Sequence, residues 1–240
     1  MYALLACLLT TAFAVDADAL EARLSEIESL RELRIQRSAP QVASADVRKA
    51  AGGTVVTGLL SSDTGSKAYG VAVVDVGIGR FWAALNDETR HPGYTAVTYS
   101  ELVSGRVCQS GRRILQYLPV PMLSDRWWIG ILTSNGKLMS QSGGSVRELS
   151  FASSTDPTEI TSESGKKMID NGVPLGFSKG GWFMVAVDDR HTYVEYYLHT
   201  DPGGRIPGSM ASMFATKGVR QNIEAMVRYA KEAKSSCAIQ

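Results

Sequence analysis

Few residues have the type and spacing that catalysis needs. Gly58–Lys67 resembles a phosphate-binding loop, but its glycines lie too far apart to form a nest of amide groups before the lysine. Ser164–Lys167 has Ser-x-x-Lys spacing without the motifs that accompany it, and Gly77-x-Gly79 lacks the third glycine of a dinucleotide-binding turn. We therefore predict no catalytic residue and no cofactor, and favour a non-enzymatic protein over an enzyme.

The three histidines are not spaced for metal binding, because none has a second ligand at helical or Cys-x-x-Cys spacing. His91 precedes Pro92 in a loop and His191 lies in a hairpin turn, so we expect both to be solvated. His199 ends a predicted strand and could line the mouth of a pocket. No metal site is predicted.

Composition and charge describe a folded chain without a nucleic-acid surface. Of 240 residues, 44% are hydrophobic and 20% charged, which is too apolar for intrinsic disorder. The 25 Lys and Arg residues nearly balance the 24 Asp and Glu residues, and no basic stripe is present, so we expect no nucleic-acid partner. Three cysteines exclude a disulfide-dense scaffold. Cys108 and Cys237 could form one disulfide or remain a buried thiol and a tail thiol.

The first residues predict export. Met1–Val15 is apolar and precedes Asp16; it is too short to span a bilayer but has the features of a secretory signal, with a small-x-small site at Ala12–Ala14. We assign residues 1–17 to the signal and expect a periplasmic or secreted protein. Lipid anchoring at Cys7 is a minor alternative, and a buried N-terminal helix is another.

Residues 18–45 are predicted to form an amphipathic helix and a linker. Leucine and isoleucine recur at steps of three and four between Asp18 and Arg37, and Ser38–Pro40 ends the pattern. We expect this helix to pack against the main domain or against a partner chain, where it would join subunits.

Residues 46–235 are predicted to form one α+β domain. A short helix at Gly77–Asp87 and a long helix from Pro207 to about Ala233 accompany consecutive strands, which favours an antiparallel sheet. The strand-like segments are Thr54–Leu60, Ala68–Val76, Tyr94–Val103, Arg106–Tyr117, Arg126–Thr133, Val146–Phe151, Gly181–Val187 and Thr192–Thr200.

Three stretches, Gly70–Asp87, Leu115–Gly130 and Trp182–Phe214, together resemble the START domain family of the Bet v 1-like helix-grip superfamily. The resemblance implies a curved antiparallel sheet wrapped around a long C-terminal helix, with an internal hydrophobic cavity. It also implies the binding, and possibly the transfer between membranes, of one lipid, sterol or other hydrophobic molecule. Because relatives in the superfamily cyclise polyketides, a cyclase or aromatase is the alternative.

Side-chain alternation indicates which strand residues face the cavity. Only one of Trp127 and Trp128 can face it, and we expect Tyr196 to point inward because a buried, unpaired Glu195 would be costly. Arg113 and Arg126 are the charges expected nearest the cavity, without a recognisable acidic partner. The predicted ligand-binding residues are Arg113, Tyr117, Arg126, Trp128, Trp182, Met184, Tyr196, Leu198, Met210, Met213 and Phe214.

The connection Leu118–Leu123 contains two prolines and no polar side chain, although connections normally lie at the surface. We predict that Leu118, Val120, Met122 and Leu123 form a lid over the cavity or a tip that transiently contacts a membrane.

Overall fold

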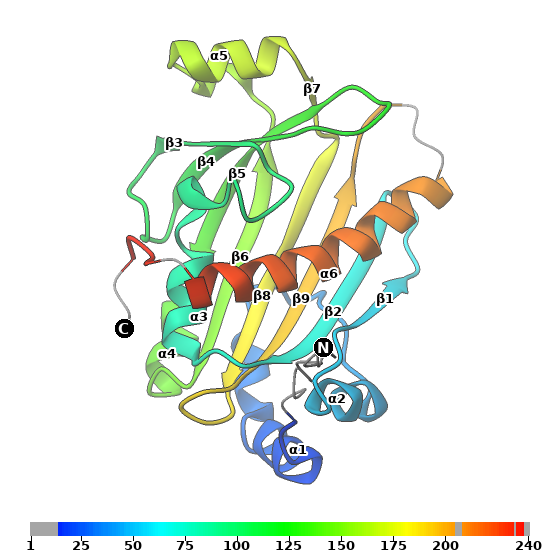
Figure 1. The fold of residues 1–240 in the computed structure, drawn as a ribbon, viewed down its shortest axis with the longest axis vertical. Helices are drawn as coiled ribbons and strands as arrows, with labels where there is room; N and C mark the ends of the chain where they lie inside the picture. Colours follow the sequence, from blue (N-terminus) through cyan, green and yellow to red (C-terminus); the bar gives the residue numbers. More distant parts are fainter. Residues whose placement is uncertain (1–13, 205–207, 233, 238–240) are drawn as a thin grey trace, which may run out of the picture.

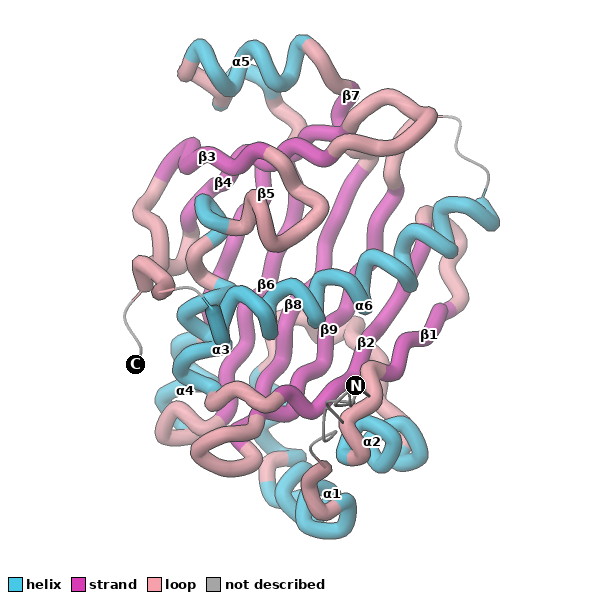
Figure 2. Tube along the Cα trace, viewed as in Figure 1, coloured by secondary structure: helices cyan, strands magenta, loops and turns pink. Residues whose placement is uncertain are grey.

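One antiparallel sheet, crossed on its concave face by the C-terminal helix α6 (Gly208–Glu232), organises the molecule (Figure 1). The computed structural model describes residues 14–204, 208–232 and 234–237, with the side chains of 208–214 not described. Most of the predicted signal, and the side chains of Met210, Met213 and Phe214, therefore lie outside the described residues. The predicted helix-grip arrangement is confirmed: α6 lies in front of the strands (Figure 2).

The sheet has the strand order β1-β2-β9-β8-β6-β5-β4-β3, so the last long strand pairs with the second. All these neighbours are antiparallel, and the short β7 (Val173–Pro174) pairs with β5 in parallel. The other strands are β1 (Val56–Leu60), β2 (Ser66–Val74), β3 (Tyr99–Ser104), β4 (Arg112–Leu118), β5 (Arg126–Ser134), β6 (Val146–Ser154), β8 (Phe177–Ala186) and β9 (Thr192–Asp201).

The two strands predicted at 94–103 and 106–117 are shorter than expected. β3 and β4 are separated by a loop in which Gly105, Cys108 and Gly111 all adopt positive φ, which a strand cannot accommodate. Cys108 forms a disulfide with Cys237, which settles the pairing that the sequence left open and ties this loop to the C-terminal tail.

The N-terminal segment packs on the convex face of its own sheet. The single helix predicted over 18–37 is wrong: α1 (Ala17–Glu26) is capped by Asp16 and ends at Ile27, and a 3₁₀ helix, η1 (Glu28–Leu33), follows. Together with α2 (Ser44–Ala51), these helices cover Val71, Phe183 and Tyr193 of the sheet. The apolar stripe of α1 is therefore buried against the main domain.

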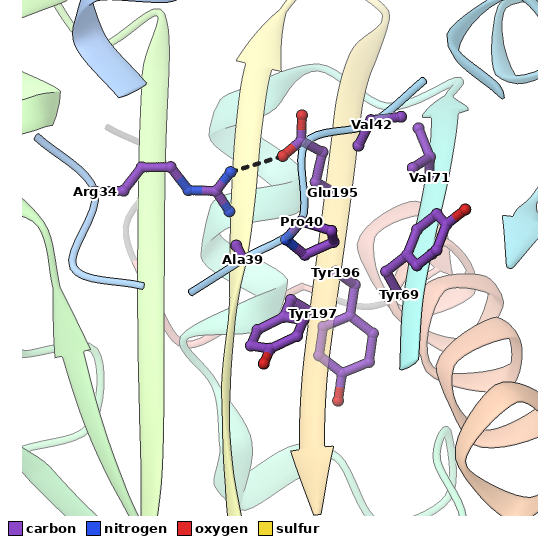
Figure 3. Close-up of a pocket in the computed structure, with 10 residues that line it drawn as sticks. Arg34, Ala39, Pro40, Val42, Tyr69, Val71, Glu195, Tyr196 and Tyr197 are labelled. Carbon is purple, nitrogen blue, oxygen red and sulfur yellow. Dashed lines mark hydrogen bonds and ion pairs between the residues drawn. The ribbon is translucent and has the colours of Figure 1, made fainter. Parts of the chain in front are cut away.

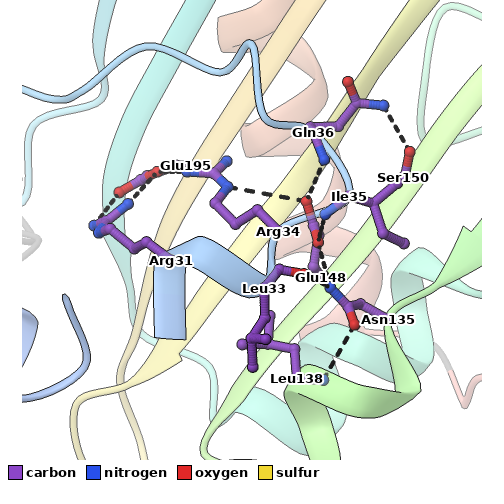
Figure 4. Close-up of polar contacts among 10 residues, drawn as sticks. All are labelled: Arg31, Leu33, Arg34, Ile35, Gln36, Asn135, Leu138, Glu148, Ser150 and Glu195. Atoms are coloured by element: carbon purple, nitrogen blue, oxygen red, sulfur yellow. Dashed lines mark hydrogen bonds and ion pairs between the residues drawn. The ribbon is translucent and has the colours of Figure 1, made fainter. Parts of the chain in front are cut away.

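A buried charge network explains why the helix stops. Arg31 and Arg34 reach Glu195 on β9, with Nη to Oε distances of 2.7 and 2.8 Å (Figure 4). Glu148 on β6 accepts the backbone N–H groups of Ile35 and Gln36 at 2.7 and 3.0 Å. The extended backbone after η1 can present these groups to the sheet, whereas an α-helix would bond them internally.

The remaining helices cover the two ends and the outer side of the sheet. α3 (Ile78–Leu85) packs against α6, α4 (Gly136–Gln141) joins β5 to β6, and α5 (Glu163–Asp170) lies over the outer face of β4 and β5 (Figure 1). Two further 3₁₀ turns are η2 (Glu88–Arg90) and η3 (Pro157–Glu159).

Candidate functional site

A cavity of about 750 Å³ lies between the concave face of the sheet and α6. On β2, the inward positions are the small residues Ala68, Gly70 and Ala72, so α6 rests directly on that strand. Toward β4, β5 and β6 the helix stands away from the sheet, and the space is left open. Its sheet wall consists of Gln116, Leu118, Trp128, Gly130, Leu132, Leu149, Phe151, Ser178, Trp182, Tyr196, Leu198 and Thr200.

Aromatic rings form the middle of this wall. The rings of Trp182 and Tyr196 stack with centroids 3.9 Å apart, and Phe151 lies 6.2 Å from Tyr196. Burial raises the pKa of Tyr196 to about 12, although a hydrogen bond from Asn222 of α6 opposes the shift. Tyr196 therefore remains a neutral phenol at physiological pH, able to bond the polar end of a guest.

A buried ion pair lies at the inner end of the cavity. Arg112, which has no exposed surface, donates from Nε and Nη2 to Glu88, and the Nε–Oε2 distance is 2.8 Å. Glu88 lines the cavity, as does His91, whose Nε2 lies 3.0 Å from the Ala84 carbonyl. The Glu88–Arg112 pair was not predicted from the sequence, and the prediction that His91 is solvated is wrong, because its side chain is buried.

We define the mouth of the cavity as its opposite end, where the 118–123 connection and Pro202 line it. Leu118 and Val120 line the cavity, while Met122 projects away from it with 96% of its surface exposed, and Leu123 does not reach the wall. Arg126 lines the mouth and bonds three backbone carbonyls, one in each of Ser124, Pro202 and Gly203.

Five of the predicted ligand-binding residues lie on the cavity wall: Arg126, Trp128, Trp182, Tyr196 and Leu198. The prediction is wrong for Arg113 and Tyr117, which lie on the outer face of the sheet. Side chains alternate along β4, so Arg112 points toward the cavity and Arg113 points away from it. Arg113 instead pairs with Glu159, and Tyr117 donates to Asp125 at 2.7 Å. Met184 points inward but is buried in the core beside the cavity.

Two other places do not provide a site. A recess of about 10 Å³ between the N-terminal segment and strands β2 and β9 has room for roughly one water molecule (Figure 3). His199 is buried, with Nε2 2.8 Å from the Thr64 carbonyl, and is not on the cavity wall. Across the described part of the chain, no cluster of three or more acidic, His or Cys side chains could hold a metal ion. None of the described helices is long and apolar enough to cross a membrane.

Comparison with known proteins identifies the fold. Neither a scan against protein-family models nor a search of curated proteins finds a match. Among solved structures, a STAR-related lipid transfer protein from Xanthomonas axonopodis matches with a TM-score of 0.58 at 16% identity, over 75% of this chain and 99% of that one. Human StAR-related lipid transfer protein 5 matches with a TM-score of 0.58 at 14% identity, over 90% and 98%. Human STARD10 matches with a TM-score of 0.56 at 14% identity, over 80% and 83%. At such identities the likeness establishes a shared fold and leaves the ligand open.

Proposed function

We propose that this chain, which has the helix-grip fold of START domains, binds one lipid-like molecule in the cavity under α6. The observation that carries the proposal is an open volume of about 750 Å³ with an aromatic and aliphatic wall. Pockets that hold small organic ligands measure roughly 300–1,000 Å³, and apolar cavities of this kind favour hydrocarbon over water.

Three titratable groups on the wall, Glu88, His91 and Arg228, favour binding over chemistry. A cyclase or aromatase needs a side chain that is free to move a proton. Glu88 is held by Arg112, His91 lies against a backbone carbonyl, and Arg228 of α6 donates to the Tyr94 carbonyl at 2.9 Å. Each of these groups therefore has a structural partner, and the enzymatic function remains the second candidate.

Transfer between membranes is a further part of the proposal. Four large hydrophobic side chains of the described residues are exposed. Three of them lie toward the mouth end of the sheet: Leu59, Met122 and Val173. A rim of this kind would enter the interfacial region of a bilayer and bring the mouth close to its lipids.

Export also belongs to the proposal. The Cys108–Cys237 disulfide supports it, because disulfides persist in oxidising compartments and are rare in the cytosol. The predicted signal within residues 1–17 would direct the chain there, and cleavage at the Ala12–Ala14 site would leave Asp16 to cap α1.

The test combines native mass spectrometry with tryptophan-fluorescence titration of a sterol, a fatty acid and a phospholipid. Gly130 faces the cavity with ordinary van der Waals space around it, so Gly130→Leu would fill part of the volume. We expect this variant to weaken binding by about tenfold or more. Gly136→Leu, at an exposed site with no neighbour within 4 Å of the added Cβ, is the matched control. A wild-type protein that carries and takes up none of these molecules would refute the proposal.

A further inference from the structure

The guanidinium of Arg126 is buried at the mouth of the cavity without an acidic partner. Only 4% of its surface is exposed, yet no carboxylate of the described residues lies within ion-pair distance of it. Its bonds go to neutral carbonyl oxygens: from Nε to Pro202 at 2.5 Å, from Nη2 to Gly203 at 3.1 Å, and from Nη1 to Ser124.

Two other buried arginines, Arg112 and Arg34, have carboxylate partners. Arg112 faces Glu88, and Arg34 faces Glu195 at 2.8 Å. Removing a charge from water is costly, and a carboxylate partner offsets that cost more fully than carbonyl dipoles do. A guanidinium has five N–H donors, so the three bonds of Arg126 leave one donor on each terminal nitrogen.

We propose that Arg126 binds the anionic end group, a carboxylate or a phosphate, of an amphiphile whose apolar body occupies the cavity. This inference rests on the proposed function and specifies its ligand class. The guest would supply the negative charge that the protein does not, and a charge-assisted hydrogen bond would fix which end of the guest lies at the mouth.

The neighbouring charged groups are compatible with an anion at this position. Lys217 of α6 also lines the cavity, and no acidic group of the described chain lies within ion-pair distance of it. The two nearest carboxylates accept from neutral donors, Asp125 from the Tyr117 hydroxyl and Asp201 from the Gly203 N–H at 2.9 Å, and neither lies within ion-pair distance of Arg126. Glu224 lines the cavity two turns further along α6 than Lys217.

The experiment compares ligands that share one tail and differ at the end group. Palmitate, hexadecyl phosphate and 1-hexadecanol are titrated into the full chain, with fluorescence of Trp128 and Trp182 as the readout. We expect the two anions to bind about tenfold or more tightly than the alcohol, because a hydrogen bond to a charged group exceeds a neutral one. Acetate and inorganic phosphate, which lack the tail, should not bind, which distinguishes a lipid end group from a free anion.

Arg126→Gln should remove this preference and leave hexadecanol binding within a few-fold of wild type. Hexadecanol also reports whether the variant is folded, since Arg126 holds two loops together. Arg113→Gln, at the arginine that pairs with Glu159 on the outer face, should leave all affinities unchanged. If wild-type protein binds the alcohol as tightly as the anions, the inference is wrong while the proposed function stands. If it binds none of the three amphiphiles, the proposed function fails as well.

Discussion

At the scale of single residues, Gly70 sets how closely α6 approaches the sheet. A Cβ built on Gly70 would lie 2.5 Å from Val219 Cγ1 and 2.8 Å from Ile223 Cδ1, both of them buried. Since a packed core cannot shift without cost, we expect Gly70→Ala to destabilise the protein by about 1–3 kcal/mol in urea unfolding.

The matched substitution is Gly218→Ala, on α6 itself, where nothing lies within 4 Å of the added Cβ. In a helix, alanine is preferred to glycine by roughly 0.5–1 kcal/mol, so this variant should be more stable than wild type. Two equal effects of the same sign would mean that Gly70 does not limit the approach of α6.

Asp87 should make stability depend on acidic pH. Burial tends to raise the pKa of this carboxyl, but hydrogen bonds from Ser236, Tyr229 and Ser235 outweigh burial and lower it. The carboxylate thus stabilises the fold at neutral pH, and this contribution is lost as pH falls below the ordinary value near 3.8 and through the lowered one.

Asp87→Asn should cost about 1–3 kcal/mol at neutral pH, because the amide has one acceptor oxygen for four donor groups. It should also flatten the acid limb of a plot of Tm against pH. Asp63→Asn, in an exposed turn, controls for the lost charge. An acid limb as steep in Asp87→Asn as in wild type would contradict this account.

The alternation of side chains along a strand predicted the cavity-lining residues correctly only where another observation fixed which set faces inward. On β9 the cost of burying an unpaired Glu195 predicts that Tyr196 and Leu198 face the cavity, and both line it. On β4 no such constraint separates Arg112 from Arg113. The prediction that Arg113 lies near the cavity is wrong, because Arg112 points inward and Arg113 points outward. Glu88, the partner of Arg112, lies in a 3₁₀ turn 24 residues away in the sequence, and no periodic pattern connects the two residues.

At the scale of elements, ion pairs hold η1 and Arg34, which we call the strap, to the convex face of the sheet. Glu195→Gln would remove the carboxylate that Arg31 and Arg34 share, leaving Arg31 the exposed Glu28 and Arg34 the more distant Glu148 at 3.9 Å. Breaking a buried ion pair costs about 3–5 kcal/mol, so we expect a loss of this size in chemical unfolding.

Two comparisons make the strap prediction specific. Glu159→Gln breaks the more exposed pair with Arg113 and should cost at most about 1 kcal/mol. Replacing Arg31, Arg34 and Glu195 together with Met should cost less than Glu195→Gln alone, because the two buried guanidinium groups are then removed, while Glu148 keeps its hydrogen bonds from Ile35, Gln36 and Asn135. A triple variant that is less stable than the single one would show that packing, and not charge compensation, holds the strap.

The element order was largely predictable because strands of β-branched residues and an amphipathic C-terminal helix have distinct periods. The end of α1 was not, because the pattern continues through Leu30 and Leu33 while Arg31 and Arg34 are drawn to a strand more than 150 residues away. Such long-range pairing overrides local helix propensity. The short α4 and α5 were also missed, since each spans too few turns to show a period.

At the scale of the whole molecule, the two ends of the sheet differ. One end carries α3, the disulfide and the C-terminal tail, and the other carries the mouth, the 118–123 connection and the start of α6 (Figure 1). A carrier that exchanges its guest with a bilayer would approach it with the end where exposed apolar side chains adjoin the cavity, which here is the mouth end.

Met122 provides the sharpest test of that polarity. It is 96% exposed at the mouth, so Met122→Asp should leave ligand affinity in solution unchanged. Transfer of a fluorescent lipid between vesicles should slow by about tenfold or more, since burying a methionine side chain in an apolar phase contributes roughly 1.5–3 kcal/mol. Ile35→Asp, 42% exposed on the convex face beside Glu148, introduces the same charge away from the mouth and should transfer at the wild-type rate. Equal slowing by both variants would indicate a general effect of charge, and no slowing by either would mean that the mouth does not enter the membrane.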